Sequence, residues 1–330
     1  MGTDGIPLTR ARAYPTIGVI LLGGLTDNQR RYPRHTSAGI AYTDGEGSMF
    51  AEVEISASST KSGSINGTAV TGDEPRSPFP ILYRYRERIL GRCKINDLGE
   101  LSFESWSRNI PSGSSDAAAA AFGASIESIL GNGFDDREVE NEFRTISESA
   151  GRSMKGGLTL THGEPDPWTE KLLGEESFDD YRIMAYRFPD VRKPSDTIHE
   201  NITSSPEYQD RIEETERKGK ELRSLAESLD IEGIFDLAEK DTDRYHRLIE
   251  SVGVRVITPG MDRMLRSLRE SRTDFWNRYI VTGGSNVFAA VRKEDTLLAE
   301  KCASGAECTV STLKVAGKPI IENMLPKKNY

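Results

Sequence analysis

Residues 109–125, which read NIPSGSSDAAAAAFGAS, constrain the fold of this chain more than any other stretch of it. The first half contains proline, glycine and serine, which are unfavourable inside a helix, whereas the second half is rich in alanine, the residue with the highest helix propensity. The stretch therefore predicts a short polar loop followed directly by a helix from about Asp116 to Leu130, which Gly131 ends.

The junction between this loop and the helix has two interpretations. The first N–H groups of the helix have no partners within it, and they point into the loop formed by Ser112, Gly113, Ser114 and Ser115. The helix dipole, the close approach that glycine allows and the serine hydroxyls would together hold a phosphate. Alternatively the serines and the aspartate cap an ordinary core helix. A Walker loop is excluded because no Gly-Lys-Ser/Thr follows.

Charge and cysteine usage exclude several classes of protein. The formal net charge of -9 argues against nonspecific nucleic-acid binding, which needs a basic surface. No stretch approaches the roughly 18 apolar residues of a membrane span, and the N-terminus lacks the apolar region of a signal peptide. Cys93, Cys302 and Cys308 are too scattered for a disulfide framework, and the histidines for a metal site. We therefore expect a cytoplasmic protein that binds neither nucleic acid nor membranes.

Apolar periodicity indicates how the 330 residues are organised, as two ordinary domains or as one α/β unit with two lobes. Alternation and glycine turns predict a mostly antiparallel sheet at the start of the chain. The proline-bracketed loop PDVRKP marks a lobe boundary, with one lobe over 1–188 and the other over 189–330. Strands are predicted at 17–22, 38–42, 49–56, 156–161, 181–188 and twice within 278–291, and helices at 81–90, 116–130, 136–149, 206–229, 232–251 and 261–271.

The polar loop resembles the Gly/Ser-rich ATP loop of the GHMP kinase superfamily, in particular its mevalonate diphosphate decarboxylase branch. PSGSSDAAA at 111–119 is similar to that loop, and IGVILLGGL at 17–25 to the branch's first strand. ESAGRSMKGG at 148–157 is similar to its Gly-Ser-Ala-Cys-Arg-Ser motif, and TGGSN at 282–286 to its Asp-Ala-Gly-Pro-Asn motif. The motifs occur in the same order and span almost the whole chain. The resemblance implies an α+β, two-lobed GHMP-kinase fold with a cleft between the lobes, and ATP with Mg²⁺ as cofactors.

The departures from that branch are informative. Its lysine and tyrosine fall on Leu21 and Leu22, its catalytic aspartate on Thr282 and a small residue on Glu148, whereas its arginine is kept as Arg152. These changes resemble the mevalonate 3-kinase family, which the segments AYPTIGVILLGG, HTSAGIAY, SESAGRS and YIVTGGSNV are also similar to.

The substitutions have a physical consequence for the substrate. A diphosphate needs cations and donors, which leucines do not offer, and Glu148 would repel it. The resemblance implies mevalonate itself, with its 5-hydroxyl near Glu148 and its carboxylate on the planar guanidinium of Arg152. An exposed helix-end role for Glu148 and a surface ion pair for Arg152 are the structural alternatives.

Thr282 cannot act as a general base at neutral pH. Phosphoryl transfer tolerates this because its transition state is loose and depends mainly on positioning and electrostatics. Decarboxylation asks for negative charge near a developing cation, which Thr282 does not supply. We therefore predict an ATP-dependent kinase that stops at 3-phosphomevalonate, with Arg152, Glu148 and Thr282 as its catalytic residues. The alternatives are a decarboxylase of mevalonate 5-phosphate, 3,5-bisphosphate or 5-diphosphate, and a non-catalytic nucleotide-binding relative.

The same resemblance implies the remaining contacts. Arg192 lies on the substrate side, and His35 and Ser37 line the substrate cleft unless they cap a strand. Mg²⁺ is expected at Ser115, with Asp116 as a second candidate. A homodimer is implied as well, and the other three histidines are expected to be structural or exposed. The ATP-binding residues are Ser112, Gly113, Ser114, Ser115 and Asp116, and the substrate-binding residues are Leu21, Leu22, His35, Ser37, Glu148, Arg152 and Arg192.

Overall fold

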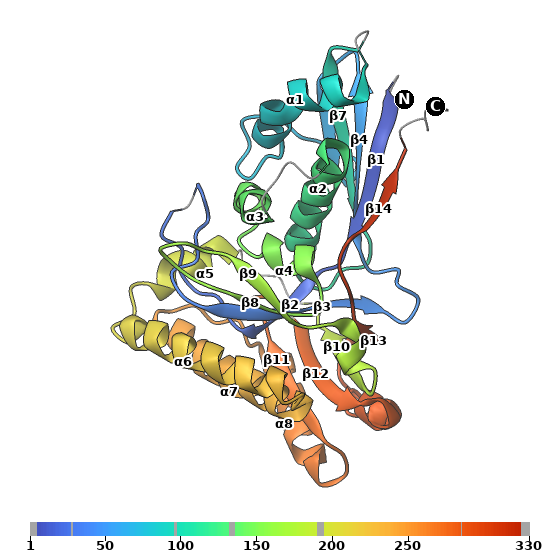
Figure 1. The fold of residues 1–330 in the computed structure, drawn as a ribbon. Coiled ribbons are helices and arrows are strands. Elements are labelled where there is room, and N and C mark those ends of the chain that lie inside the picture. The colour runs from blue at the N-terminus through green and yellow to red at the C-terminus, as the bar shows by residue number, and fades with distance from the viewer. Residues whose placement is uncertain are drawn as a thin grey trace.

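Two β-sheets with helices packed against them make up the molecule (Figure 1). The computed structural model describes residues 5–27, 29–95, 98–131, 136–189, 195–284 and 286–324. One sheet has six strands and the other eight, and the chain passes between them more than once. Within these residues, no helix combines the length and the apolar character that crossing a membrane requires.

The six-stranded sheet packs one face against α1 and α2. Its strands follow the order β14-β1-β4-β7-β5-β6, all antiparallel except the parallel pair β5–β7. The fully buried alanines at 119–121 let α2 lie close to β1 and β4, because methyl groups add little thickness. Phe103 of β7 meets Phe122 of α2 and Phe79 of α1 edge-on, with ring centroids 4.8 and 5.0 Å away. The strands are β1 (Ile6–Ala13), β4 (Ala51–Ser58), β5 (Ser62–Ile65), β6 (Thr68–Ala69), β7 (Glu100–Ser107) and β14 (Ile320–Asn323), and the helices α1 (Phe79–Cys93), α2 (Ser114–Leu130), α3 (Asp136–Arg144) and α4 (Ala150–Lys155).

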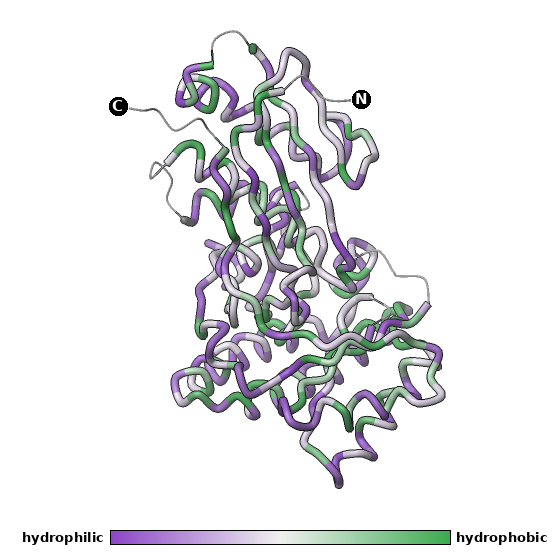
Figure 2. The backbone as a smooth tube through the Cα atoms, turned by 90° about the vertical axis from the view of Figure 1, so that its right-hand side faces the viewer, coloured by the Kyte–Doolittle hydropathy of each residue, from purple (hydrophilic) through white to green (hydrophobic). Residues whose placement is uncertain are grey.

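The eight-stranded sheet is covered by the long helices α6 and α7 (Figure 1). Its order is β11-β12-β10-β13-β3-β8-β9, and β2 pairs with β3. In Figure 2 hydrophobic and hydrophilic positions are interspersed along the helices, as expected for helices that bury one face. The strands are β2 (Thr16–Ile20), β3 (Ser37–Asp44), β8 (Leu158–Thr161), β9 (Thr169–Leu173), β10 (Tyr181–Arg187), β11 (Asn277–Val281), β12 (Asn286–Arg292) and β13 (Thr309–Val315), and the helices α5 (Ser195–Ile202), α6 (Tyr208–Glu227), α7 (Ile231–Ser251), α8 (Pro259–Glu270) and α9 (Thr296–Lys301), with 3₁₀ turns at Glu175–Phe178, Ser271–Thr273 and Lys293–Asp295.

Local chemistry explains where the helices of the second half begin. The carboxylate of Asp230 accepts a 2.9 Å hydrogen bond from the N–H of Gly233 and caps α7. The hydroxyl of Thr258 caps α8, and Pro259 occupies the first helical position, where its missing N–H costs nothing. The predicted helices at 81–90, 116–130, 206–229, 232–251 and 261–271 are confirmed within a few residues at each end.

The predicted helix over 136–149 is wrong in its last turn and a half. Helix α3 ends at Arg144, and α4 starts only at Ala150. The Arg144 side chain, fully buried, pairs with Glu140 and donates a 3.0 Å hydrogen bond to the carbonyl of Glu148. This interaction holds the chain in a turn, although apolar periodicity continues to Ile146.

The proposed lobe boundary at residue 188 stays a prediction. The eight-stranded sheet takes β2, β3, β8, β9 and β10 from before it and β11, β12 and β13 from after it. The last strand, β14, returns to pair with β1 in the other sheet. The two halves of the chain are therefore joined by strand pairing as well as by the linker.

Candidate active site

A cavity of about 120 Å³ lies where the start of α2 faces the end of β2 and the turn between β11 and β12. It is the place where most of the predicted site residues come together. Those that line it are Leu21, Leu22, Ser112, Gly113, Ser115, Asp116, Glu148, Arg152 and Thr282. Residues more than 160 positions apart in the chain therefore line one cavity, as the four motifs predict.

The remaining predicted residues have other positions. Ser114 opens α2 but does not line the cavity. His35 is buried behind the wall, where its Nε2 accepts a hydrogen bond from the N–H of Gly23 at 3.2 Å. Ser37 is buried too and accepts a 2.6 Å hydrogen bond from Arg152. Arg192 lies outside the described residues.

The loop before α2 has the geometry of an anion cradle. Gly113 has a φ of 77°, and a Cβ on it would lie 2.6 Å from the carbonyl oxygen of Thr16, so a larger residue does not fit. Within the described residues, no side chain caps the helix. The hydroxyl of Tyr42 holds both the N–H and the C=O of Ser112, at 3.1 and 2.6 Å, and the Ser112 hydroxyl lies 3.2 Å from that of Thr282. The capping alternative therefore loses its main support.

Asp116, in the first turn of α2, is surrounded by hydroxyl groups. Its two carboxylate oxygens accept hydrogen bonds from Thr16 and Ser147, each at 2.7 Å. Burial and the nearby charge of Glu148 raise the pKa of Asp116, although these hydroxyls and Arg152 oppose the shift. A carboxylate held in this way faces the cavity without a cation bonded to it among the described residues.

Glu148 has a different set of neighbours. Its Oε2 accepts a 2.9 Å hydrogen bond from Nε of Arg31 and lies 2.7 Å from Nη2 of the same guanidinium, and its Oε1 lies 3.2 Å from Nε2 of His199. Burial alone would raise the pKa of Glu148, but the hydrogen bond from His199 and the charge of Arg31 outweigh it and hold the pKa well below 4.5. With only 11% of its side chain exposed, Glu148 is not the surface residue of the structural alternative.

Arg152 supplies the cation of the cavity. Its side chain is 5% exposed, one guanidinium nitrogen donates to Ser37, and its buried Nε has no partner among the described residues. Burial lowers the pKa of Arg152, while the charges of Asp116 and Glu148 oppose the shift. Because Arg152 is buried, the surface ion-pair alternative is wrong. An anionic ligand in the cavity would complete the hydrogen bonds of this guanidinium.

The segment 21–24, which forms the cavity wall after β2, is held by side chains rather than by a neighbouring strand. The N–H of Leu21 donates to Asp241 at 2.7 Å, and its carbonyl accepts from Arg211 at 2.7 Å. Arg211 and Asp241 are themselves a fully buried ion pair, 2.5 Å between Nη1 and Oδ1. The carbonyls of Leu22 and Gly23 accept from the hydroxyls of Tyr245 and Tyr208, at 3.0 and 2.6 Å.

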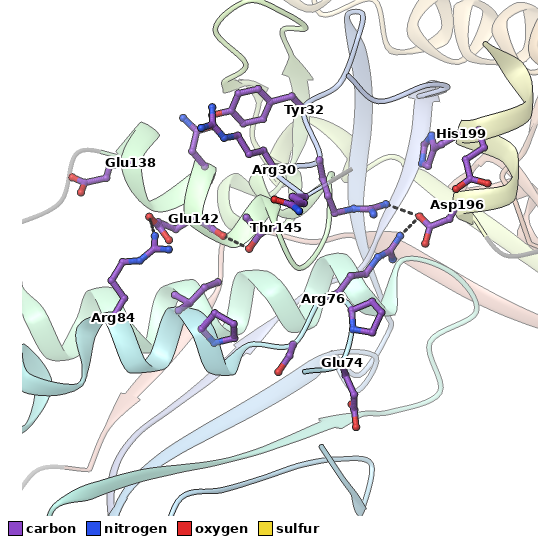
Figure 3. Close-up of a pocket in the computed structure, with 18 residues that line it drawn as sticks. Arg30, Tyr32, Glu74, Arg76, Arg84, Glu138, Glu142, Thr145, Asp196 and His199 are labelled. Carbon is purple, nitrogen blue, oxygen red and sulfur yellow. Dashed lines mark hydrogen bonds and ion pairs between the residues drawn. The ribbon is translucent and has the colours of Figure 1, made fainter. Parts of the chain in front are cut away.

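A larger cavity of about 940 Å³ adjoins the first (Figure 3). It lies between the N-terminal half of α1, α3, α5 and the loop over 29–32, and its lining carries charges of both signs. Arg31 reaches Asp196. Arg76 reaches the same carboxylate, and Arg84 pairs with Glu142 (Figure 3). His199 lines both cavities, so the two adjoin at this side chain.

Sequence reasoning missed three residues that shape the site. These are Arg31, Asp241 and Arg211, which had no assignment. His199, which was expected to be structural or exposed, is 7% exposed and bonded to Glu148. For Arg31 the single local signal is the turn composition TDNQRRYP, which does not say where the side chain points.

The chemistry that this cavity allows follows from its parts. A phosphate group can lie on the Ser112–Asp116 loop, and a carboxylate or another anion can lie on Arg152. The described residues contain no group of three histidine, cysteine, aspartate or glutamate side chains that could hold a metal alone. Ser115 and Asp116 could add one or two ligands to a cation that is held mainly by phosphates.

Comparisons of sequence and of structure with known proteins agree with one another. Residues 13–171 match the diphosphomevalonate decarboxylase-like N-terminal domain, and residues 193–296 match the mevalonate-3-kinase C-terminal domain. The mevalonate-3-kinase of Picrophilus torridus is 42% identical over 94% of this chain and 96% of its own length. The mevalonate 3-kinase of Thermoplasma acidophilum is 44% identical over 86% of this chain and 88% of its own. The crystal structure of the T. acidophilum enzyme with mevalonate 3-phosphate and ADP bound is similar with a TM-score of 0.89, at 39% identity over 96% of this chain and 99% of that one.

Proposed function

This chain belongs to the mevalonate-3-kinase family, and we propose that it transfers the terminal phosphoryl group of ATP to the 3-hydroxyl of mevalonate. The products are 3-phosphomevalonate and ADP, and the carboxylate is retained. The fold is the two-lobed α+β fold of GHMP kinases. The observation that carries the proposal is that one cavity joins the Ser112–Asp116 loop, Arg152 and Glu148.

The Ser112–Asp116 loop would bind the polyphosphate of ATP. Its glycine lies directly against the backbone of Thr16, and the hydroxyls of Ser112 and Ser115 line the cavity. The helix dipole of α2 adds positive potential at this end. The loop is rigid because Tyr42 holds Ser112 from behind, so little ordering would be needed when a nucleotide binds.

Mevalonate would lie across the cavity between two side chains from the same segment. Arg152 is suited to its carboxylate, because a buried guanidinium with unused donors favours a bidentate anion. Glu148 is suited to its 5-hydroxyl, which can donate to a carboxylate, and Leu21 and Leu22 cover the methylene chain between. The 3-hydroxyl would then face the phosphate loop.

The transfer needs positioning more than base catalysis. Thr282 cannot take a proton at neutral pH, and its hydroxyl is next to that of Ser112, beside the expected phosphate. A loose transition state is stabilised by the donors of the loop and by near-in-line placement of the 3-hydroxyl. The carboxylate stays attached because no acidic side chain stands at position 282 to support a developing cation at C3.

Magnesium fits this donor set. Mg²⁺ in such sites is bound by one or two protein oxygens together with substrate phosphates. Ser115 and Asp116 would supply them here, and the ion would neutralise charge on the phosphoryl oxygens. A cytoplasmic location, pairing into homodimers and the substrate contact of Arg192 stay predictions.

The direct test is product analysis. Purified protein with ATP, Mg²⁺ and mevalonate is expected to release ADP, and phosphorus NMR is expected to place the new phosphate on C3. Mevalonate-dependent ADP release also separates an enzyme from a non-catalytic relative. A phosphate on C5, or release of carbon dioxide as fast as ADP, would overturn the proposal.

A further inference from the structure

Arg31 is placed beside the candidate active site by an unusual loop. The residue has a φ of 55°, a left-handed conformation that residues other than glycine rarely adopt. The carboxylate of Asp27 accepts from the N–H groups of Gln29 and Arg30, at 2.7 and 2.9 Å, and the N–H of Arg31 donates to the Asp27 carbonyl. A backbone conformation that costs energy points to a constraint elsewhere, and the constraint here is the position of the guanidinium.

The guanidinium of Arg31 is buried directly behind Glu148. Its side chain is 5% exposed and bonds to Glu148 at 2.7 Å and to Asp196 at 2.8 Å. Asp196 is half exposed and also pairs with Arg76, so Glu148 is the buried partner of Arg31. Arg31 lines the larger cavity and Glu148 the smaller one, so their ion pair is the partition between the two.

His199 completes this arrangement from the other side. Its Nδ1 accepts a hydrogen bond from the N–H of Gly24 at 3.2 Å, so in this tautomer the proton is on Nε2. Nε2 then donates to Oε1 of Glu148, 3.2 Å away. Oε2 faces two nitrogens of Arg31, whereas Oε1 has His199 as its side-chain donor. Oε1 can therefore accept one more hydrogen bond, which leaves room for a hydroxyl donor but none for another acceptor.

We infer that Arg31 is a masked anion-binding residue and that Glu148, by pairing with it, makes the site select a hydroxyl rather than a phosphate at C5 of the substrate. This inference deepens the proposed function and rests on its placement of C5 at Glu148. Discrimination against a phosphorylated substrate then has two causes. Glu148 repels the phosphate, and it also occupies the guanidinium that would otherwise bind it.

Masking of Arg31 and simple repulsion by Glu148 lead to different results when Glu148 is removed. If repulsion were the whole cause, a neutral residue at 148 would merely tolerate a phosphate. If Arg31 is masked, removing Glu148 frees a buried guanidinium, which favours a phosphate strongly and bidentately. The gain must then disappear when Arg31 is removed as well.

The experiment compares four proteins: wild type, Glu148→Ser, Arg31→Met and the double variant. Binding of mevalonate and of mevalonate 5-phosphate is measured by calorimetry, and ADP release is measured with each. Glu148→Ser is expected to bind mevalonate 5-phosphate about tenfold or more tightly than wild type, because a charge-assisted pair replaces a repulsion. Its binding of mevalonate is expected to weaken, because the hydroxyl loses its acceptor. The double variant is expected to lose the gain.

Two outcomes would overturn the inference. In one, Glu148→Ser binds mevalonate 5-phosphate no better than wild type, and in the other, the gain survives removal of Arg31. Thermal unfolding checks that each variant is folded; if Glu148→Ser is not, Glu148→Gln carries the same test, since it removes the charge and keeps the volume. Wild-type ADP release with mevalonate tests the proposed function separately. Its absence would remove that function, whereas a failed gain in Glu148→Ser alone would remove only the masking.

Discussion

Two buried carboxylates in one cavity, Asp116 and Glu148, have opposite electrostatic environments. Asp116 is bonded to two hydroxyl groups, and its pKa is raised, whereas Glu148 is bonded to Arg31 and His199, and its pKa is held well below its ordinary value. Burial acts in the same direction on both. The difference therefore comes from the neighbouring groups, and under the proposed function Asp116 lies at the phosphate end of the cavity and Glu148 at the hydroxyl end.

The neighbours of each carboxylate also determine what it can bind. Among the described residues no cation is bonded to Asp116, so its carboxylate can gain one, and a metal with its phosphates would supply it. A carboxylate that is already neutralised can accept a hydrogen bond from a neutral group at little further cost. Each end of the cavity is thus complementary to a different part of the proposed substrates.

The largest effect is expected when Glu148 loses its cation. In Arg31→Met the carboxylate keeps its bond to His199 but loses its cation, and breaking a buried pair in this way costs about 3 kcal/mol of unfolding free energy. Urea unfolding at neutral pH measures the loss. Arg76→Met removes a neighbouring, more exposed arginine of the same cluster and is the matched control, with a loss below about 1 kcal/mol. Equal losses in the two variants would show that Glu148 does not depend on Arg31.

A smaller effect is expected when Glu148 is made neutral in place. Glu148→Gln keeps the shape but loses two charge-assisted hydrogen bonds, and the variant is expected to lose about 1–3 kcal/mol at neutral pH. Under the proposed function the Michaelis constant for mevalonate also rises, with a smaller change in kcat. An unchanged Michaelis constant would separate Glu148 from the substrate.

The pH dependence of stability follows from the lowered pKa of Glu148. Because its folded-state pKa lies below the ordinary 4.5, its contribution is fully present above pH 4.5 and is lost as the pH falls through the folded-state value. Wild type is therefore expected to lose stability more steeply than Glu148→Gln on acidification from pH 5. Urea midpoints at half-unit pH steps measure the difference. Parallel curves for the two proteins would contradict the lowered pKa.

The smallest effect on stability is expected at the other carboxylate. The pKa of Asp116 is raised, so its ionised form costs stability above the ordinary value of 3.8, and Asp116→Asn removes that cost. We expect the unfolding free energy at neutral pH to change by less than about 1 kcal/mol or to increase. ADP release should fall sharply if Asp116 serves the phosphate end. A stability loss as large as that of Arg31→Met would erase the contrast between the two sites.

Local patterns predicted the parts of the site that are local. The polar loop, the alanine helix and the glycine at 113 follow from propensity and turn chemistry, and they have the predicted form. The resemblance of the four motifs to the family predicted that Glu148, Arg152 and Thr282 belong to one site, and all three line the same cavity. Both kinds of prediction depend on short stretches whose meaning does not require the rest of the chain.

The unpredicted parts depend on contacts between distant residues. Arg31 and Glu148 are 117 positions apart, and Leu21 and Asp241 are 220 apart. No periodicity or spacing within a segment encodes such pairs. The break between α3 and α4 has the same origin, because it is held by the buried Arg144 side chain, while the apolar pattern on its own continues the helix.

The side-chain support of the segment 21–24 has a consequence for how the molecule opens. Amide protons in β2 exchange with water only when its ladder with β3 separates, but those of Leu21 and Gly24 depend on a residue of α7 and one of α5. Loosening of those helices would therefore soften the pocket wall while the sheet stays intact. A substitution in α7 can thus alter the wall of the candidate site through the backbone of residues 21–24.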